Sequence, residues 1–341
     1  MSSTQRRLFT IVVALSAAMV AQAFGRFTWG VVLPEARDDL LEGSNTAAGL
    51  FGTLNVSGYL VGTVVVAWLA SRSTLVGLVK IGLTCSTSGL ALASFTTEPV
   101  VLAVALVLMG LGGAIIWVPV PGITAREFPP QRRGFATGLA GVGIGLGIVF
   151  AGRVASMLRG GDAAVWQTLY RIELAIAVCV LAAALVGLRS QGERPSTAGG
   201  FGGFGALRRI EGWKPLTFAY SAYGFSYILV ISFVVARLED DADWSPDRAA
   251  LVFSVIGVAI VFGGLTVGSL AFFPAMDVVR QALPMVLTML KMALVICIPL
   301  VLLIWILVTG RTPYLAAFTG ITSCAIVGLT TQMSGNKAKN W

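Results

Sequence analysis

The sequence predicts an all-α, polytopic membrane protein of about ten spans, with a six-span N-terminal bundle and an incomplete second bundle. Three observations predict this class. Of 341 residues, 56% are hydrophobic and only 12% are charged, whereas about a quarter of the residues in soluble domains are charged. The apolar residues gather in stretches that match the roughly 20 helical residues needed to cross a bilayer. The alternating pattern of a membrane β-barrel is absent from them.

The expected spans follow one another with short polar loops between them. The first six are residues 8–33, 46–70, 75–95, 100–124, 135–158 and 164–188. The last four are residues 215–236, 249–273, 283–308 and 313–331. The start of the first span, with Arg6, Arg7 and the triplet Ala21-Gln22-Ala23, also resembles a cleavable secretory signal. Because the apolar pattern continues to Leu33, we expect an uncleaved span.

Loop charges predict the orientation. Alternate loops are basic, and the others are acidic: Asp38, Asp39, Glu42, Glu239, Asp240, Asp241, Asp243 and Asp247. Exceptions to this sorting are Arg159, Arg237, Arg248 and Arg311. Because basic loops stay in the cytoplasm, we expect a multi-pass protein of the bacterial inner (plasma) membrane with both termini cytoplasmic. The same loops account for the net charge of +8, so no nucleic-acid partner is needed to explain it.

Composition argues against several function classes. The chain has no histidine, and its four cysteines lie in apolar stretches without a CxxC pair. We therefore expect no bound metal. No phosphate-binding loop and no nucleophile elbow occurs, so we expect neither an enzyme nor a cofactor. The GxGxxG-like spacing in residues 138–152 follows no strand and predicts a flat helix face for close packing.

A polar stretch divides the chain. Residues 189–214 are rich in Gly, Ser, Pro and Arg, which is typical of a flexible linker, here on the cytoplasmic side. We expect four parts: the six-span bundle (1–188), this linker (189–214), the first two spans of a second bundle (215–271) and a divergent tail with two spans (272–341).

The parts on either side of the linker resemble each other. FGRFTWGVVLPEARDDL (24–40) ends a span and opens an acidic loop, and YGFSYILVISFVVARLEDD (223–241) does the same. The spans that follow, 48–70 and 249–271, share Gly, Leu and Ala positions at a constant offset. Two halves in the same orientation are typical of parallel membrane repeats.

These segments resemble the major facilitator superfamily, in its YbfB/YjiJ-like branch. The resemblance covers about residues 8–271 and rests on GRFTWGVVLP (25–34), Asn55, Gly58-Tyr59, the Gly-rich fifth span and SAYGFSYILVISFVVARL (221–238). It implies a secondary transporter that rocks two bundles around a central site. The chain departs from the family at the loop ASRST (70–74), where Arg72 is the only basic residue, and at Leu106, where an arginine is usual.

After Ala271 the repeat stops. Residues 277–304 resemble the membrane region of TraG-type conjugative-transfer proteins. A fusion that replaced the last third of a transporter and a diverged or truncated transporter end explain the tail equally well. The alternative function is therefore a non-transporting membrane protein with a structural or assembly role.

Polar and aromatic side chains within the spans are the candidate substrate contacts. The resemblance implies that spans one, four and seven line a cavity for a small-molecule substrate. The predicted substrate-binding residues are Gln22, Arg26, Asn55, Tyr59, Trp117, Tyr220, Tyr223 and Tyr227. The last three share one helix face at i, i+3 and i+7, a stripe that is also typical of packing. Apart from this substrate and the lipid bilayer we expect no partner, and no oligomer.

Three charged residues within the spans have two interpretations each. Arg26 lies about 8 Å outward from the centre of its span, so it either snorkels to the interface or faces the cavity and binds an anionic group such as a carboxylate. Arg153 and Glu173 lie in the outer parts of the fifth and sixth spans. They form either a structural ion pair or part of a coupling site, and the ion pair is the simpler account.

Overall fold

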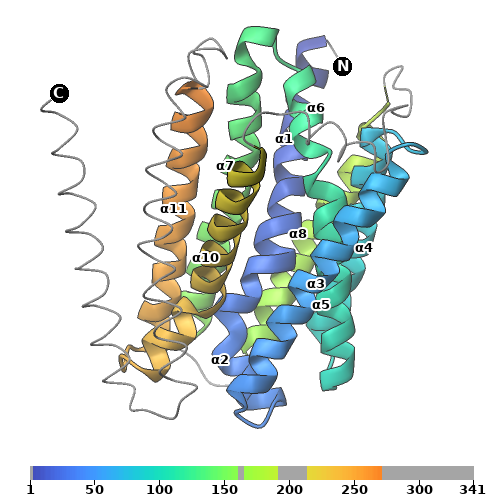
Figure 1. Cartoon of the computed structure of the whole chain (residues 1–341). Helices are drawn as coiled ribbons and strands as arrows, with labels where there is room; N and C mark the ends of the chain where they lie inside the picture. Colours follow the sequence, from blue (N-terminus) through green and yellow to red (C-terminus); the bar gives the residue numbers. More distant parts are fainter. Residues whose placement is uncertain (1–2, 160–164, 191–212, 271–341) are drawn as a thin grey trace, which may run out of the picture. The chain divides into compact units, whose positions relative to one another are not determined.

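The computed structural model describes residues 3–159, 165–190 and 213–270 of the chain (Figure 1). Every regular element within these ranges is a helix. Eight stretches of these described helices are long and apolar enough to cross a membrane: Thr4–Leu40, Asn45–Leu69, Leu75–Phe95, Pro99–Arg126, Pro130–Leu158, Trp166–Gly187, Tyr220–Asp240 and Pro246–Thr266. They coincide with the first eight expected spans. The ninth and tenth, and most of the linker, lie outside the described residues.

The chain separates into two compact units. The first holds Met1–Leu207 and Ile228–Phe272, and the second holds Arg208–Tyr227 and Phe273–Trp341. The four parts expected from the sequence (1–188, 189–214, 215–271 and 272–341) follow different boundaries, and that division stays a prediction.

The first span is built from three consecutive helices. They are α1 (Ser3–Ala18), the π-helix η1 (Met19–Phe27) and α2 (Thr28–Leu40). The π turn shows in the backbone, where the amide of Thr28 donates to the carbonyl oxygen of Ala23, five residues earlier. Wider π turns within α-helices are frequent at functional sites. The span is longer than expected because α2 continues through charged residues to Leu40.

Polar residues at their N-termini start the next two helices. The hydroxyl of Ser44 accepts a hydrogen bond from the amide of Ala47 at the start of α3 (Asn45–Leu69). The hydroxyl of Thr74 does the same with Gly77 at the start of α4 (Leu75–Phe95). Such caps satisfy amides that the first helical turn leaves without an acceptor.

The remaining described helices complete the first unit and enter the second. Prolines separate α5 (Pro99–Trp117) from α6 (Val120–Arg126), and both belong to the fourth span. The others are the short 3-10 helix η2 (Pro130–Arg132), α7 (Arg133–Leu158), α8 (Val165–Gly187), α10 (Trp213–Asp240) and α11 (Pro246–Leu270).

Glycines let two pairs of helices approach to backbone contact. A Cβ atom at Gly110 of α5 would lie 2.1 Å from the carbonyl oxygen of Asn55 in α3. One at Gly145 of α7 would lie 2.7 Å from the carbonyl oxygen of Gly257 in α11. The flat face predicted for residues 138–152 therefore packs against α11, and the two helices run side by side (Figure 1).

The outer surface of the first unit suits lipid. Large apolar side chains such as Leu60, Val100 and Val186 are more than two-thirds exposed. Buried polar side chains lie inside, among them Gln22, Asn55 and Glu173. The chain is therefore a multi-pass membrane protein with its polar groups turned inward.

Candidate functional site

Four predicted substrate contacts lie together in the first unit. Nη1 of Arg26 donates to Oε1 of Gln22 at 3.0 Å, and Nε2 of Gln22 donates to the hydroxyl of Tyr59 at 3.5 Å. The guanidinium carbon of Arg26 lies 4.1 Å from the centroid of the Tyr59 ring. Asn55 is one turn of α3 from Tyr59. We name Gln22, Arg26, Asn55 and Tyr59 the first-span cluster.

Asn55 holds the backbone around this cluster. Its Nδ2 donates to the carbonyl oxygen of Gly25 at 2.9 Å and to that of Leu106 at 2.8 Å. The amide thus joins η1, α3 and α5 at one point, and its side chain is almost fully buried. Because both amide hydrogens are used in these bonds, Asn55 positions the cluster rather than presenting donors to a ligand.

The position of Arg26 bears on its two interpretations. The side chain is half-buried and turns back along the span toward Gln22, with its guanidinium over the Tyr59 ring and 5.4 Å from the centroid of Phe27. Its contacts thus include a neutral amide and the faces of two aromatic rings, which attract a cation. The geometry favours the inward orientation over snorkelling.

The other predicted contacts lie on α5 and α10. Trp117 is half-buried at the end of α5, about two turns beyond Gly110, which approaches the backbone of Tyr59. Tyr220, Tyr223 and Tyr227 lie on α10 in the second unit, with neighbouring ring centroids 6.4 and 5.4 Å apart. They share one helix face, as their spacing predicts, and Tyr220 and Tyr223 are largely exposed.

The ion pair expected between Arg153 and Glu173 does not form. Arg153 of α7 is exposed, whereas Glu173 of α8 is fully buried. Oε1 of Glu173 lies 2.6 Å from the hydroxyl oxygen of Thr28 instead. The two residues were paired because both are charged and lie in the outer halves of adjacent spans, but their side chains face opposite ways.

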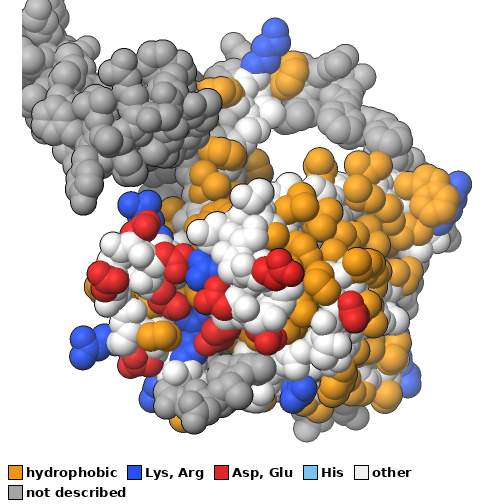
Figure 2. Space-filling model, turned by 90° about the horizontal axis from the view of Figure 1, so that it is seen from below, with side chains coloured by type: hydrophobic (Ala, Val, Ile, Leu, Met, Phe, Trp, Pro, Cys, Tyr) orange, Lys and Arg blue, Asp and Glu red, His pale blue; other side chains and the backbone are white. Residues whose placement is uncertain are grey.

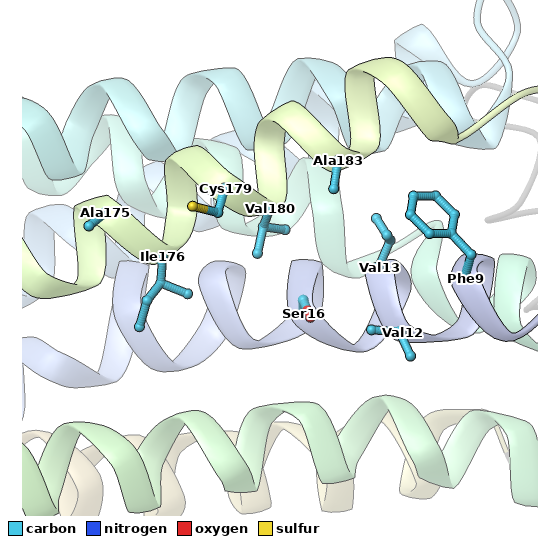
Figure 3. A pocket seen from close by; sticks show the side chains of 9 residues that line it. All are labelled: Phe9, Val12, Val13, Ser16, Ala175, Ile176, Cys179, Val180 and Ala183. Atoms are coloured by element: carbon cyan, nitrogen blue, oxygen red, sulfur yellow. The ribbon is translucent and has the colours of Figure 1, made fainter.

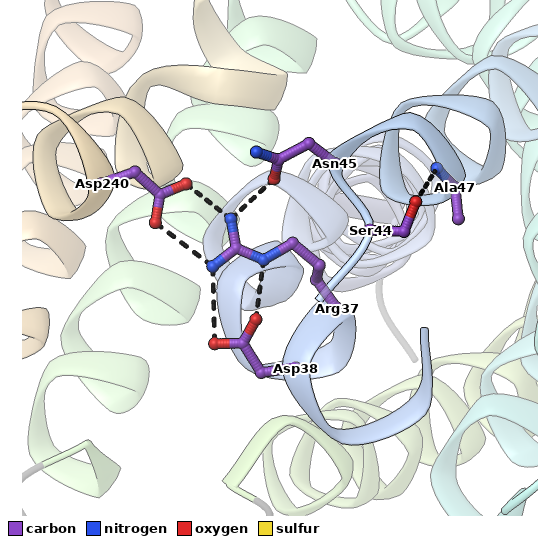
Figure 4. A network of polar contacts seen from close by, with 6 residues as sticks. All are labelled: Arg37, Asp38, Ser44, Asn45, Ala47 and Asp240. Carbon is purple, nitrogen blue, oxygen red and sulfur yellow. Dashed lines mark hydrogen bonds and ion pairs between the residues drawn. The ribbon is translucent and has the colours of Figure 1, made fainter. Parts of the chain in front are cut away.

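A network of ion pairs at one end of the first unit was missed by the sequence analysis. Nη1 of Arg37 donates to Oδ2 of Asp240 at 2.5 Å and Nη2 donates to Oδ1 at 3.2 Å (Figure 4). The same guanidinium donates to Asp38 at 2.8 Å and to Asn45 at 2.7 Å. We name this end, where α2 and α10 finish and α3 and α11 begin, the acidic end. Figure 2 shows acidic side chains gathered there around basic ones.

Arg159 forms the second centre of this network. Its side chain is 1% exposed and lies against Glu35, at 2.8 Å, and against Glu239. Its Nη2 also donates to the carbonyl oxygen of Val31 at 2.5 Å. One signal was available in the sequence, because Arg159 is an exception among the acidic loops.

An apolar groove of about 440 Å³ lies between α1 and α8 (Figure 3). Apart from Ser16 it is lined by apolar or sulfur-bearing side chains, including Phe9, Ile176 and Cys179. It offers no cation for a charged ligand, and the Ser16 hydroxyl is its one strong hydrogen-bond donor among the lining side chains. Nor do His, Cys, Asp and Glu of the described ranges form a group of three or more that could hold a metal ion.

Comparisons with known proteins identify relatives of the chain. The family model for the Major Facilitator Superfamily matches residues 10–339. It therefore also spans the tail, beyond the residues 8–271 on which the resemblance rested. No sequence among the curated proteins matches the chain.

Several solved structures share the fold, and two of them are transporters in inward-facing or inward-open conformations. One is a bacterial homologue of the human lysosomal transporter Spinster in an inward-facing, unoccupied conformation, with a TM-score of 0.62 and 16% identity over 96% of this chain and 80% of that one. The other is the Escherichia coli xylose transporter XylE in a partially occluded, inward-open conformation, with a TM-score of 0.58 and 15% identity over 96% and 87%. At such identities these likenesses establish the fold alone.

Proposed function

The chain belongs to the Major Facilitator Superfamily, and we propose that it is a secondary active transporter that moves a small anionic metabolite by alternating access. The position of Arg26 is the observation that carries this proposal. A half-buried guanidinium within a membrane span, held by Gln22 and Tyr59, is costly to maintain unless it has a role. Paired hydrogen bonds from such a fork to a carboxylate are strong and directional.

The acidic end fits the gating that alternating access needs. Arg37 and Arg159 connect helices of the first six spans, α2 and α7, to residues Asp240 and Glu239 at the end of α10. In a rocking mechanism these contacts hold the acidic end closed in one state and break in the other.

The finer family placement and the topology belong to the same proposal. GRFTWGVVLP (25–34) and SAYGFSYILVISFVVARL (221–238) support the YbfB/YjiJ-like branch. The sorting of loop charges supports the inner membrane with both termini cytoplasmic. The match of the family model through residue 339 favours a diverged transporter end over a TraG-type fusion.

The proposal is tested with the full chain purified and reconstituted into liposomes. A panel of radiolabelled monocarboxylates and dicarboxylates is screened by counterflow, and Arg26→Gln is compared with Arg153→Gln. Both variants remove one arginine from a span, but Arg153 is exposed and outside the cluster. A charge-assisted pair lost from the site should weaken binding by about 10- to 100-fold. Uptake that is equal in both variants would remove Arg26 from the site, and absence of uptake for every carboxylate would favour the non-transporting alternative.

A further inference from the structure

Glu173 is the most deeply buried acidic residue among those described, and it contacts the first span. Its side chain and that of Thr28 are both 0% exposed. The Thr28 hydroxyl oxygen lies 2.6 Å from Oε1 of Glu173 and 3.2 Å from the carbonyl oxygen of Ala23. Oε2 of Glu173 is buried and has no hydrogen-bond partner among the described residues.

The hydrogen bonds around Thr28 depend on the protonation of Glu173. A threonine hydroxyl carries one hydrogen and can donate only one bond. The carbonyl oxygen of Ala23 can only accept. With an ionised Glu173 the one hydrogen of Thr28 is shared between the two acceptors. Two full hydrogen bonds form at the same time when Thr28 donates to Ala23 and the carboxyl group of Glu173 donates to Thr28. That arrangement needs a protonated Glu173.

No cation offsets a negative charge on Glu173 within the described part of the chain. α8 packs against α1, η1, α2, α4 and α7, and the titratable side chain that interacts with Glu173 is Tyr170, one turn away and also fully buried. The basic side chains on and next to these helices contact groups other than Glu173. Four of them are exposed: Arg6, Arg7, Arg133 and Arg153. The others have contacts elsewhere: Arg26 with Gln22, Arg37 with Asp38 and Asp240, Lys80 with the carbonyl of Leu185, Arg159 with Glu35 and Glu239, and Arg171 with the carbonyl of Ser94. The acidic residues there, Glu35, Asp38 and Asp39, have partners at the acidic end, and the thiol of Cys85 donates to the carbonyl of Leu108.

An ionised carboxylate that is buried without a cation is strongly disfavoured, whereas a neutral carboxyl group in the same place is tolerated. Both the hydrogen-bond geometry and the burial of Glu173 thus favour the protonated form in this conformation.

We propose that Glu173 is the proton-binding site that couples transport to a proton gradient. This inference rests on the proposed function. Thr28 lies two residues after Arg26 in the same span, so a movement of η1 and α2 that accompanies anion binding also alters the Thr28–Glu173 contact. When that contact opens to water, the carboxyl group releases its proton to water and becomes a carboxylate. It takes a proton from water before the contact closes again.

One helix face connects the site to the acidic end. Tyr170 and Trp166 precede Glu173 at i−3 and i−7 on α8, and their rings make an edge-to-face contact. The indole of Trp166 donates to Oδ2 of Asp39, which is exposed, at 2.9 Å. Trp166 lies about 10 Å from Glu173 by helical rise, so this face of α8 carries contacts from the buried carboxyl group to the acidic end.

The protonation state is tested by infrared spectroscopy on the full chain in lipid bilayers, which requires no substrate. The wild type should show the C=O stretching band of a protonated carboxyl group at neutral pH. Glu173→Gln should lose it, while Glu98→Gln, which removes an exposed carboxylate, should keep it. Thr28→Val should keep the band but shift it to higher frequency, because a hydrogen-bond partner is lost. The band should also shift in D₂O, as a proton that exchanges with water requires.

Each outcome decides the proposal. A band that survives Glu173→Gln, or a wild type without it, shows that Glu173 is ionised and overturns the inference. A band that is insensitive to pH and to deuterium shows a permanently neutral structural group and also overturns it. If a carboxylate from the panel is transported, Glu173→Gln should retain counterflow and lose accumulation driven by a pH gradient. Accumulation that persists in this variant overturns the coupling role while leaving the substrate site intact.

Discussion

Arg37 and Asp240, which are 203 residues apart in the sequence, form a two-pronged ion pair at the acidic end (Figure 4). Arg37 is almost fully buried, and Asp38 and Asn45 occupy the rest of its guanidinium. The pair joins the end of the first span to the end of the seventh, which occupy equivalent places in the two halves of the repeat. In the proposed alternating-access mechanism such a contact between the two halves forms in one state and breaks in the other.

Breaking this pair should open the acidic end. Asp240→Asn removes the negative charge but keeps the shape of the side chain, so the two-pronged ion pair with Arg37 weakens. The free energy of the closed state should rise by about 1–3 kcal/mol relative to the open state. A cysteine placed at Ala36, which is fully buried beside Arg37, should then react faster with a membrane-impermeant maleimide. The matched control is Asp241→Asn, whose partner Arg237 and own side chain are largely exposed. An equal labelling rate in both backgrounds contradicts the gate.

Removal of Arg159 should be the most damaging change at the acidic end. Arg159→Ala leaves Glu35 and Glu239 close together without their shared cation, and the Arg159 side chain is 1% exposed. Breaking a buried ion pair in this way costs about 3–5 kcal/mol, which should appear as a lower unfolding temperature in detergent. Adding Glu239→Gln should restore part of the loss. A double variant no more stable than Arg159→Ala contradicts the argument.

Gly110 should not tolerate a methyl group. The Cβ atom of Gly110→Ala would lie 2.1 Å from the carbonyl oxygen of Asn55, so α3 and α5 must move apart, at a cost of about 1–3 kcal/mol. Gly263→Ala is the control, since nothing lies within 4 Å of its added Cβ atom. There the change should be neutral or stabilising, by up to about 1 kcal/mol. Thermal unfolding of the two variants measures the contrast, and equal losses refute it.

The ring of Tyr59 should matter more than its hydroxyl. Tyr59→Phe keeps the aromatic face under the Arg26 guanidinium and removes the hydroxyl that accepts a 3.5 Å hydrogen bond from Gln22. Tyr59→Leu loses the face, which is worth about 0.5–2 kcal/mol. Carboxylate affinity should therefore fall by less than about threefold in the first variant and by more in the second. Equal affinities in the two variants would show that the face is not used.

Hydropathy predicted the eight described spans because it is a local property. Twenty apolar residues in a row have to be in lipid whatever they pack against. The first span was nevertheless predicted to end at Leu33, although α2 continues to Leu40. Its last turns carry charges, and they remain helical because Glu35 pairs with Arg159, which follows α7, and Arg37 pairs with Asp240 of α10.

The π-helix η1 could not be predicted from the sequence. Nothing in MVAQAFGRF distinguishes it from an ordinary α-helical segment. Within this π-helix the carbonyl oxygen of Gly25 accepts a hydrogen bond from Asn55 of α3, which also donates to the carbonyl oxygen of Leu106 in α5. Both partner helices lie far along the chain from η1.

The sequence by itself determined the class of protein, the succession of spans, the sorting of charges and the candidate residues Gln22, Arg26, Asn55 and Tyr59. The tertiary structure alone decided which charges meet. Glu173 was expected to pair with Arg153 and lies against Thr28 instead, and Arg37 was not singled out although it binds Asp240. The physical reason is that a partner depends on which helix faces oppose each other. Close approaches such as that of Gly110 to Asn55 set those faces, and they join residues that hydropathy treats separately.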